Sequence, residues 1–118
     1  MRATDAVGIY GEKLADRYLR AQGFTVLDRR WRCAQGEIDL VAVDDGCLVV
    51  CEVKTRRSVH AGGPEEAVTP AKLARLRRLT AVWLAQQEVS WSDVRIDVVT
   101  VLLHRAGPAH IEHLRAVG

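Results

Sequence analysis

The sequence predicts a mixed α/β sheet flanked by two helices, with the elements in the order αβββαβ and a weak further strand at the end. Two observations indicate this class: two stretches have helical periodicity, and several apolar stretches have strand composition. With 118 residues the chain is expected to form one domain, residues 1–118. Its 48% hydrophobic and 27% charged residues are typical of a globular protein and exclude a disordered tail.

Two helices are expected from their start and stop signals. The first covers residues 4–22, and Gly23 is placed to end it. The second begins at Thr69-Pro70, in the usual order of an N-cap followed by proline at the first helical position. Apolar residues then recur on one face from Leu73 to Trp83, so this face is expected to pack on the sheet.

Two of the expected strands form a hairpin around Asp45-Gly46. This dipeptide is a strong hairpin signal, because a type I′ turn needs a positive φ at both central positions. A long connection over residues 56–68, containing Gly62-Gly63-Pro64, separates the hairpin from the second helix. The expected strands cover residues 24–32, 37–43, 48–54, 94–103 and, more weakly, 110–114.

The hairpin turn also predicts which side chains share a face of the sheet. If Asp45 and Gly46 form the whole turn, Asp39 lies opposite Glu52 on the partner strand. A slip of one residue would place these charges on the apolar face, so the pattern supports this register. The expected apolar face consists of Ile38, Leu40, Ala42, Val49, Cys51 and Val53.

Asp39 opposite Glu52 is an unfavourable pair in a sheet built only for stability. Two carboxylates about 5 Å apart repel by about 3 kcal/mol at an effective dielectric constant of 20. A bound cation, a proton on one carboxylate, or compensation by Lys54 and nearby arginines would relieve the repulsion. Mg²⁺ fits an oxygen-rich site best, and the alternative is that these are edge-strand charges facing water. Glu37, expected opposite Lys54, would form an ordinary cross-strand ion pair.

Glu12 is a third carboxylate candidate. In the first helix it shares a face with Gly8, Ile9, Ala15 and Leu19. A glutamate in this partly apolar stripe either points toward the sheet or reaches solvent from the edge of the stripe.

Positive charge is concentrated in residues 56–78, which carry a net charge of +4. Of the seventeen cationic residues in the chain, fourteen are arginine, whose planar guanidinium suits phosphate oxygens. This segment predicts either contact with nucleic acid or a solvated helix face.

Other classes of protein are disfavoured. Cys33, Cys47 and Cys51 contain no Cys-x-x-Cys pair, so a disulfide framework or a zinc site is not expected. No apolar run approaches the roughly 20 residues of a membrane span. The N-terminal residues lack the apolar core of a signal peptide, so we expect a cytoplasmic protein without membrane contact.

Asp39 followed thirteen positions later by Glu52-Val53-Lys54 resembles the PD-(D/E)xK core of restriction-endonuclease-like nucleases. The surrounding phrases are similar to the YraN family, small bacterial proteins related to archaeal Holliday-junction resolvases. This resemblance extends from about Val7 to Val101. Its phrases are Gly11-Glu12, Gly36-Glu37-Ile38-Asp39-Leu40, Glu52-Val53-Lys54-Thr55-Arg56, Lys72 and Arg95-Ile96-Asp97-Val98-Val99.

Three positions depart from the pattern of these families. Ile38 stands in place of the proline that precedes the aspartate, and Arg30 stands where the YraN family usually has asparagine. Cys51 stands in place of a more usual valine or phenylalanine, which should matter only for packing. Asp97 belongs to a shared phrase but is expected to be structural.

The resemblance implies a restriction-endonuclease-like fold and a metal site. Asp39 and Glu52 would hold Mg²⁺, for which Mn²⁺ is a substitute, together with the Val53 carbonyl and waters. Glu12 would contribute directly or through a water. The metal would lower the pKa of a bound water and offset the charge of the scissile phosphate.

The resemblance also implies roles for the neighbouring charges. Lys54 would orient the attacking water and stabilise charge, since nearby carboxylates favour its ammonium form over the free base. Glu37 would hold Lys54 in place. The residues expected to contact the DNA backbone are Arg56, Arg57, Lys72 and Arg75.

The hypothesis is therefore a Mg²⁺-dependent DNA endonuclease that acts on branched or distorted DNA, structure-selective or non-specific. The alternatives are a non-catalytic nucleic-acid-binding adaptor with a nuclease fold, and a protein-interaction module with relict acidic residues. Related resolvases act as symmetric dimers, so the resemblance implies a homodimer, for which the residues give no independent indication.

Overall fold

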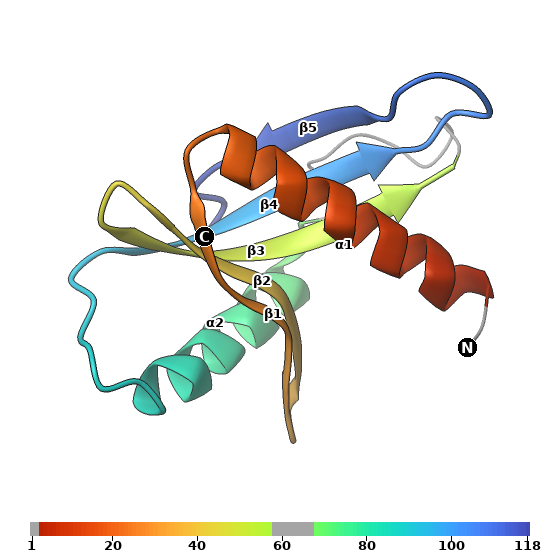
Figure 1. Cartoon of the computed structure of the whole chain (residues 1–118). Coiled ribbons are helices and arrows are strands. Elements are labelled where there is room, and N and C mark those ends of the chain that lie inside the picture. The colour runs from red at the N-terminus through yellow and green to blue at the C-terminus, as the bar shows by residue number, and fades with distance from the viewer. Residues whose placement is uncertain (1–2, 58–67) are drawn as a thin grey trace.

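The computed structural model describes residues 3–57 and 68–118, with side chains from residue 6 onward. Helices and strands follow the predicted order, including the weak final strand (Figure 1). The predicted Gly62-Gly63-Pro64 segment lies outside the described residues. The elements are α1 (Ala3–Ala21), β1 (Thr25–Cys33), β2 (Gly36–Asp44), β3 (Cys47–Arg56), α2 (Pro70–Ala85), β4 (Val94–Leu102) and β5 (His110–Leu114).

The strands form one mixed sheet in the order β1-β2-β3-β4-β5. Strands β3 and β4 are parallel, and the other neighbours are antiparallel. A parallel pair needs a crossover connection, and α2 lies within it. The predicted α/β class is confirmed, and the arrangement is compatible with a nuclease-like fold.

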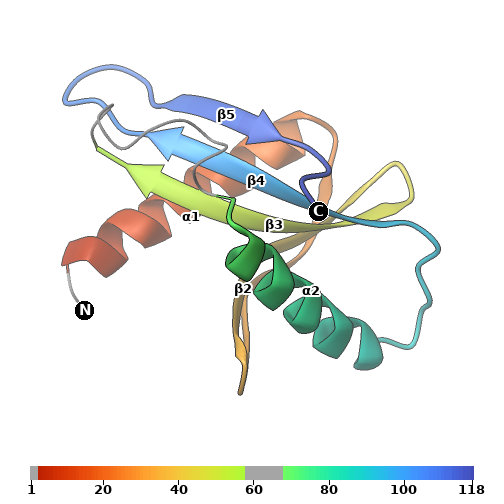
Figure 2. The ribbon, with the colours of Figure 1, turned by 180° about the vertical axis from the view of Figure 1, so that it is seen from behind.

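The two helices cover opposite faces of the sheet, as Figure 1 and the reverse view in Figure 2 show. Each helix closes its own apolar core. The core beneath α1 contains Ala15, Leu19, Phe24, Leu40, Ala42, Val49, Cys51, Val99 and Val101. The core beneath α2 contains Ile38, Val41, Leu48, Val50, Leu76, Leu79, Trp83 and Ile96.

The local signals in the sequence form the expected turns and caps. Gly23 ends α1 with a φ of 94°, a conformation that glycine adopts without steric cost. Asp45 and Gly46 have φ values of 48° and 81°, as a type I′ turn requires. The Thr69 side chain caps α2 by accepting a hydrogen bond from the Lys72 amide at 3.1 Å.

Strand β2 leaves β3 halfway along the hairpin. The predicted register holds from the turn to Leu40, which pairs with Cys51, and the ladder ends there. Placing Ile38 on the same face as Leu40 was wrong, because Ile38 packs beneath α2 and Leu40 beneath α1. The bend coincides with Arg30 on the adjacent strand, which has a left-handed φ of 49°. Beyond it, the β1–β2 ribbon projects away from the rest of the sheet (Figure 1).

Within the described residues, no helix is long and apolar enough to cross a membrane.

Candidate functional site

The acids predicted from the sequence meet at the point where β2 leaves β3. Asp39 comes from β2, Glu52 from β3 and Glu12 from α1. The Val53 amide donates a hydrogen bond to Asp39 Oδ2 at 2.8 Å, so a side chain takes the place of a backbone acceptor on β2. The opening between the strands lets a residue from the α1 face reach this site.

The Asp39 carboxyl is held in its neutral form. Burial, followed by the negative charge of Glu52, raises its pKa to about 8, although the Val53 amide favours the charged form. The charge of Glu12 and a hydrogen bond between the Asp39 and Glu52 carboxyls add to the rise. A proton held on Asp39 is the second of the three ways in which its repulsion with Glu52 can be relieved.

Glu12 points into the protein instead of into solvent. Its Oε1 is buried without a hydrogen-bond partner, and burial raises its pKa. Carboxylate oxygens of Glu12, Glu37 and Asp39 lie within 4.8 Å of one another. We call Glu12, Glu37, Asp39 and Glu52 the acid cluster.

Glu37 is not placed as the sequence predicted. The β2–β3 ladder ends before Glu37 could pair with Lys54. Its carboxylate instead forms ion pairs with Arg30 and Arg32 of β1, each at 3.5 Å. Because β2 bends away from β3 at Asp39, Glu37 follows β1 and joins the acid cluster.

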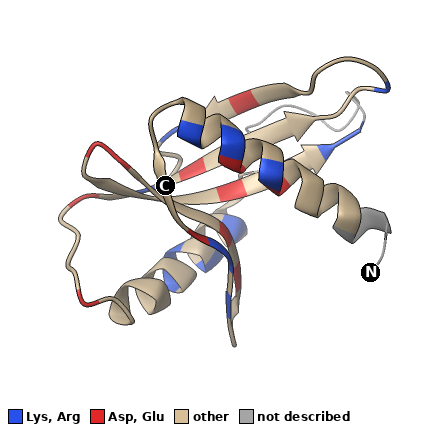
Figure 3. Ribbon diagram, in the orientation of Figure 1, with Lys and Arg blue, Asp and Glu red and all other residues tan. Residues whose placement is uncertain are grey.

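Besides Arg32, two arginines reach the acid cluster from opposite sides. Arg30 Nη1 of β1 lies 3.6 Å from Glu12 Oε1. Arg75 Nη2 of α2 lies 3.5 Å from Glu52 Oε2. Figure 3 shows acidic and basic segments side by side along β1 and β2. The sequence analysis assigned no role to Arg30; the family's asparagine at this position was the available signal, since asparagine is enriched at left-handed φ.

Lys54 is exposed beside a pocket of about 420 Å³ next to the acid cluster. The pocket lies between the first half of α1 and the end of β3, and Arg57 contributes a second positive charge. Helix α1 approaches β3 so closely here that a Cβ atom on Gly11 would lie 1.8 Å from Thr55 Oγ1. The other lining residues are Val7, Gly8, Glu12, Val53 and Thr55.

The remaining predicted DNA contacts lie at the ends of elements. Arg56 is half-buried at the end of β3, where its carbonyl accepts a hydrogen bond from the Leu103 amide at 2.7 Å. Lys72 lies in the first turn of α2.

The donor set fits a hard divalent cation. Its carboxylate oxygens are the ligands that Mg²⁺ prefers. The buried Glu12 Oε1 lacks a hydrogen bond, and burial and the charge of Glu52 keep the pKa of Asp39 high, so the cluster accommodates more positive charge than Arg30, Arg32 and Arg75 supply. Glu12, Glu37 and Asp39 offer oxygens close enough together to hold such an ion, and Glu52 lies beside Asp39.

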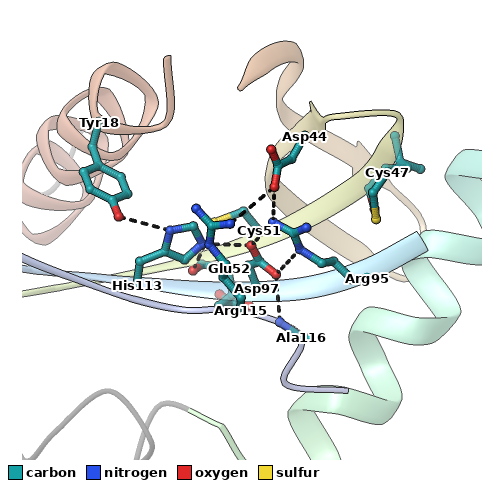
Figure 4. Close-up of polar contacts among 11 residues, drawn as sticks. Tyr18, Asp44, Cys47, Cys51, Glu52, Arg95, Asp97, His113, Arg115 and Ala116 are labelled. Carbon is teal, nitrogen blue, oxygen red and sulfur yellow. Dashed lines mark hydrogen bonds and ion pairs between the residues drawn. The ribbon is translucent and has the colours of Figure 1, made fainter. Parts of the chain in front are cut away.

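A second polar network lies on β4 and β5 and was not foreseen as a unit (Figure 4). Asp97 is fully buried and accepts hydrogen bonds from Arg95 at 3.0 Å and from the Ala116 amide at 3.0 Å. His113 Nε2 lies 2.8 Å from Asp97, and its Nδ1 lies 3.2 Å from the Tyr18 hydroxyl. The network ties β5 and the C-terminal residues to β4 and α1.

Fold and site together define an α/β protein with a carboxylate cluster where its mixed sheet opens. The chain belongs to the uncharacterised protein family UPF0102, whose model matches residues 11–101. This confirms the family resemblance that the motifs indicated.

The chain is similar along its whole length to several UPF0102 proteins. The relative from Beutenbergia cavernae is 59% identical over 118 residues, which cover all of both chains. The relative from Kineococcus radiotolerans is 61% identical, covering 99% of this chain and 97% of its own. The relative from an Arthrobacter species is 52% identical over the full length of both.

Proposed function

We propose that the protein is a Mg²⁺-dependent DNA endonuclease that hydrolyses phosphodiester bonds in branched or distorted DNA. The observation that supports this function is the convergence of Asp39, Glu52 and Glu12 beside Lys54, where burial and the charge of Glu52 raise the pKa of Asp39 to about 8. Perturbed carboxylates in this arrangement are typical of functional sites.

The acidic residues bind the metal ion, and Lys54 positions the attacking water and the phosphate. A divalent cation bound by Asp39, Glu52 and Glu12 would supply an acidified water and offset charge on the phosphate. Asp39 must lose its proton to act as a ligand, so metal affinity increases with pH up to about 8. The exposed Lys54 ammonium orients the attacking water and the phosphate from the adjacent pocket.

DNA contact is assigned to the cations around the acid cluster. Arg57 lines the pocket and Arg56 lies at the end of β3. Lys72 and Arg75, in contrast, lie on α2 at the other face of the sheet, where Arg75 pairs with Glu52 (Figures 1 and 2). Arginine and lysine bind the phosphate backbone in a salt-dependent way without reading bases. The sequence contains no base-reading motif, so this binding depends on the shape of the DNA.

The decisive variant is Asp39→Asn. We expect it to lower Mg²⁺- or Mn²⁺-dependent cleavage of labelled junction, flap and single-stranded DNA by about 100-fold or more, because it removes a metal ligand. Asp45→Asn is the matched control: it makes the same chemical change in the same hairpin, at a turn position that suits asparagine. Equal cutting by the wild-type protein and Asp39→Asn would indicate a contaminating nuclease.

The second candidate is a non-catalytic DNA-binding adaptor. It is favoured by Arg30 and Arg75, which partly neutralise the acids without a metal ion. This candidate predicts salt-dependent DNA binding that Asp39→Asn preserves and Arg57→Ala weakens, with no cleavage by the wild-type protein in Mn²⁺. Metal-dependent cleavage that Asp39→Asn abolishes would exclude it.

A further inference from the structure

We propose that Arg30 is an internal counter-cation of the acid cluster that a divalent cation displaces, after which its guanidinium binds the DNA backbone and couples metal binding to DNA binding. The inference rests on the proposed metal-dependent function and assigns that site an exchangeable positive charge.

Arg30 bridges two of the acids without hydrogen bonding tightly to either. Its Nη1 lies 3.6 Å from Glu12 Oε1, and its Nε lies 3.5 Å from Glu37 Oε1. Both separations exceed the usual N–H···O range of 2.7–3.2 Å, so these contacts are held by charge. Glu12 Oε1 remains without a hydrogen bond although the guanidinium is its neighbour.

The charges around Arg30 are unequal. Glu12, Glu37 and Asp39 place three carboxyl groups within 4.8 Å, and the guanidinium brings one positive charge to them. A small divalent ion carries twice that charge and approaches oxygen to about 2.1 Å. The ion would therefore bind the same oxygens more strongly than the guanidinium.

Arg30 can leave the acids without unfolding the strand. Its side chain is 36% exposed, whereas that of Glu12 is only 17% exposed. A guanidinium is more weakly hydrated than an ammonium and matches phosphate oxygens with two parallel donors. Once displaced, it would lie at the mouth of the cluster, where the phosphate that meets the metal would also lie.

Arg32 offers a comparison on the same strand. It pairs with Glu37 at the same distance, 3.5 Å, but its side chain is 67% exposed. Exposed pairs of this kind contribute little to stability or affinity. Displacement of a guanidinium from the acids by the divalent cation, which we call the exchange, is therefore assigned to Arg30 and not to Arg32.

The test compares Arg30→Asn, Arg30→Lys and Arg32→Gln in the full-length protein. Asparagine removes the charge and suits the left-handed φ of 49° at this position, so Arg30→Asn is expected to fold. Thermal unfolding of each variant checks this. Mn²⁺ affinity is measured by calorimetry without DNA, and affinity for a labelled four-way junction by fluorescence anisotropy with and without Ca²⁺.

We expect Arg30→Asn to bind Mn²⁺ about tenfold more tightly, because its competitor is gone. The same variant should lose most of the gain in DNA affinity that Ca²⁺ produces in the wild-type protein. Linkage requires that metal and DNA raise each other's affinity by the same factor, so the ratio of the DNA affinities with and without Ca²⁺ measures the coupling. Arg30→Lys should keep part of this coupling, and Arg32→Gln should change neither affinity by more than about twofold.

An Mn²⁺ affinity of Arg30→Asn equal to or weaker than that of the wild-type protein would overturn the exchange. Absence of Mn²⁺ binding in both proteins would overturn the exchange and the proposed function together. Tighter Mn²⁺ binding together with a smaller Ca²⁺-dependent gain in DNA affinity in Arg30→Asn would support the exchange. If the wild-type protein then cleaves no DNA, only the nuclease function is overturned.

Discussion

Asp39 and Asp97 lie on strands on either side of β3, and their environments differ in the supply of hydrogen-bond donors. Asp97 is fully buried, yet Arg95, His113 and a backbone amide surround it. Burial would raise its pKa, but these hydrogen bonds outweigh burial and lower it. Asp39 is half-buried, and burial, followed by the charge of Glu52, raises its pKa to about 8 although the Val53 amide donates a hydrogen bond to it.

The comparison shows that burial alone does not separate a structural acid from a functional one. The more buried aspartate is the one whose negative charge is satisfied by its neighbours. The less buried one is left with a like charge, and this makes it a candidate ligand.

The largest effect should come from Asp97→Asn. It removes the charge that Arg95, His113 and the Ala116 amide all contact, and breaking a buried ionic network costs about 3 kcal/mol or more. Urea unfolding at pH 7 would measure this loss. Asp44→Asn is the control, since Asp44 pairs with Arg95 at 2.9 Å in a less buried position and should cost about 1 kcal/mol. Equal losses would contradict the assignment of Asp97 as the centre of the network.

Asp39→Asn should have an effect of the opposite sign. The folded protein holds a proton on Asp39 up to pH about 8, whereas the unfolded chain releases it near the ordinary value of 3.8. The folded state then binds more protons, so this group lowers the free energy of unfolding as pH rises from about 4 to 8. Asp39→Asn should therefore be more stable than the wild-type protein, increasingly so toward pH 8, when chelator is present.

Urea unfolding of both proteins at several pH values between 5 and 9 measures that difference. Asp97 supplies a reference without slope over this range, because its lowered pKa contributes stability that is fully present above its unfolded pKa of about 4 and is lost only as pH falls below that value. A stability difference between Asp39→Asn and the wild-type protein that stays constant over this range would show that Asp39 is already ionised.

The smallest expected effect concerns Cys51, which pairs with Leu40 on one side and Asp97 on the other. Burial, and then the charge of Asp97, raises the pKa of its thiol. With Cys33 and Cys47 replaced by serine, Cys51 should react slowly with a thiol reagent. Asp97→Asn should accelerate the reaction about tenfold by increasing local opening, and Asp39→Asn should not. Equal acceleration by both variants would remove the distinction between the two regions.

Much of the fold follows from short-range signals. Asp45-Gly46, Gly23 and Thr69-Pro70 specify turns and caps through backbone conformation, and the structure confirms each of them. Such features depend on neighbouring residues alone, so they can be predicted from the sequence without knowledge of tertiary contacts.

The candidate site was predictable only in part. The hairpin register brought Asp39 and Glu52 together, although the ladder ends one pair before them. The position of Glu37 depends on the bend at Arg30, a residue with no intrinsic preference for a left-handed φ. The Asp97–His113 contact joins two strands through a geometry that no local spacing encodes.

The bend in β2 has a mechanical consequence. Ile38 packs in the core beneath α2 and Leu40 packs in the core beneath α1. Asp39 therefore lies on a short segment whose two neighbours are held in separate cores. A loosened fit under either helix would rotate that short span and shift the carboxyl relative to Glu52. Substitutions that remove apolar volume from either core, far from the acid cluster, should therefore alter metal-ion affinity before they unfold the chain.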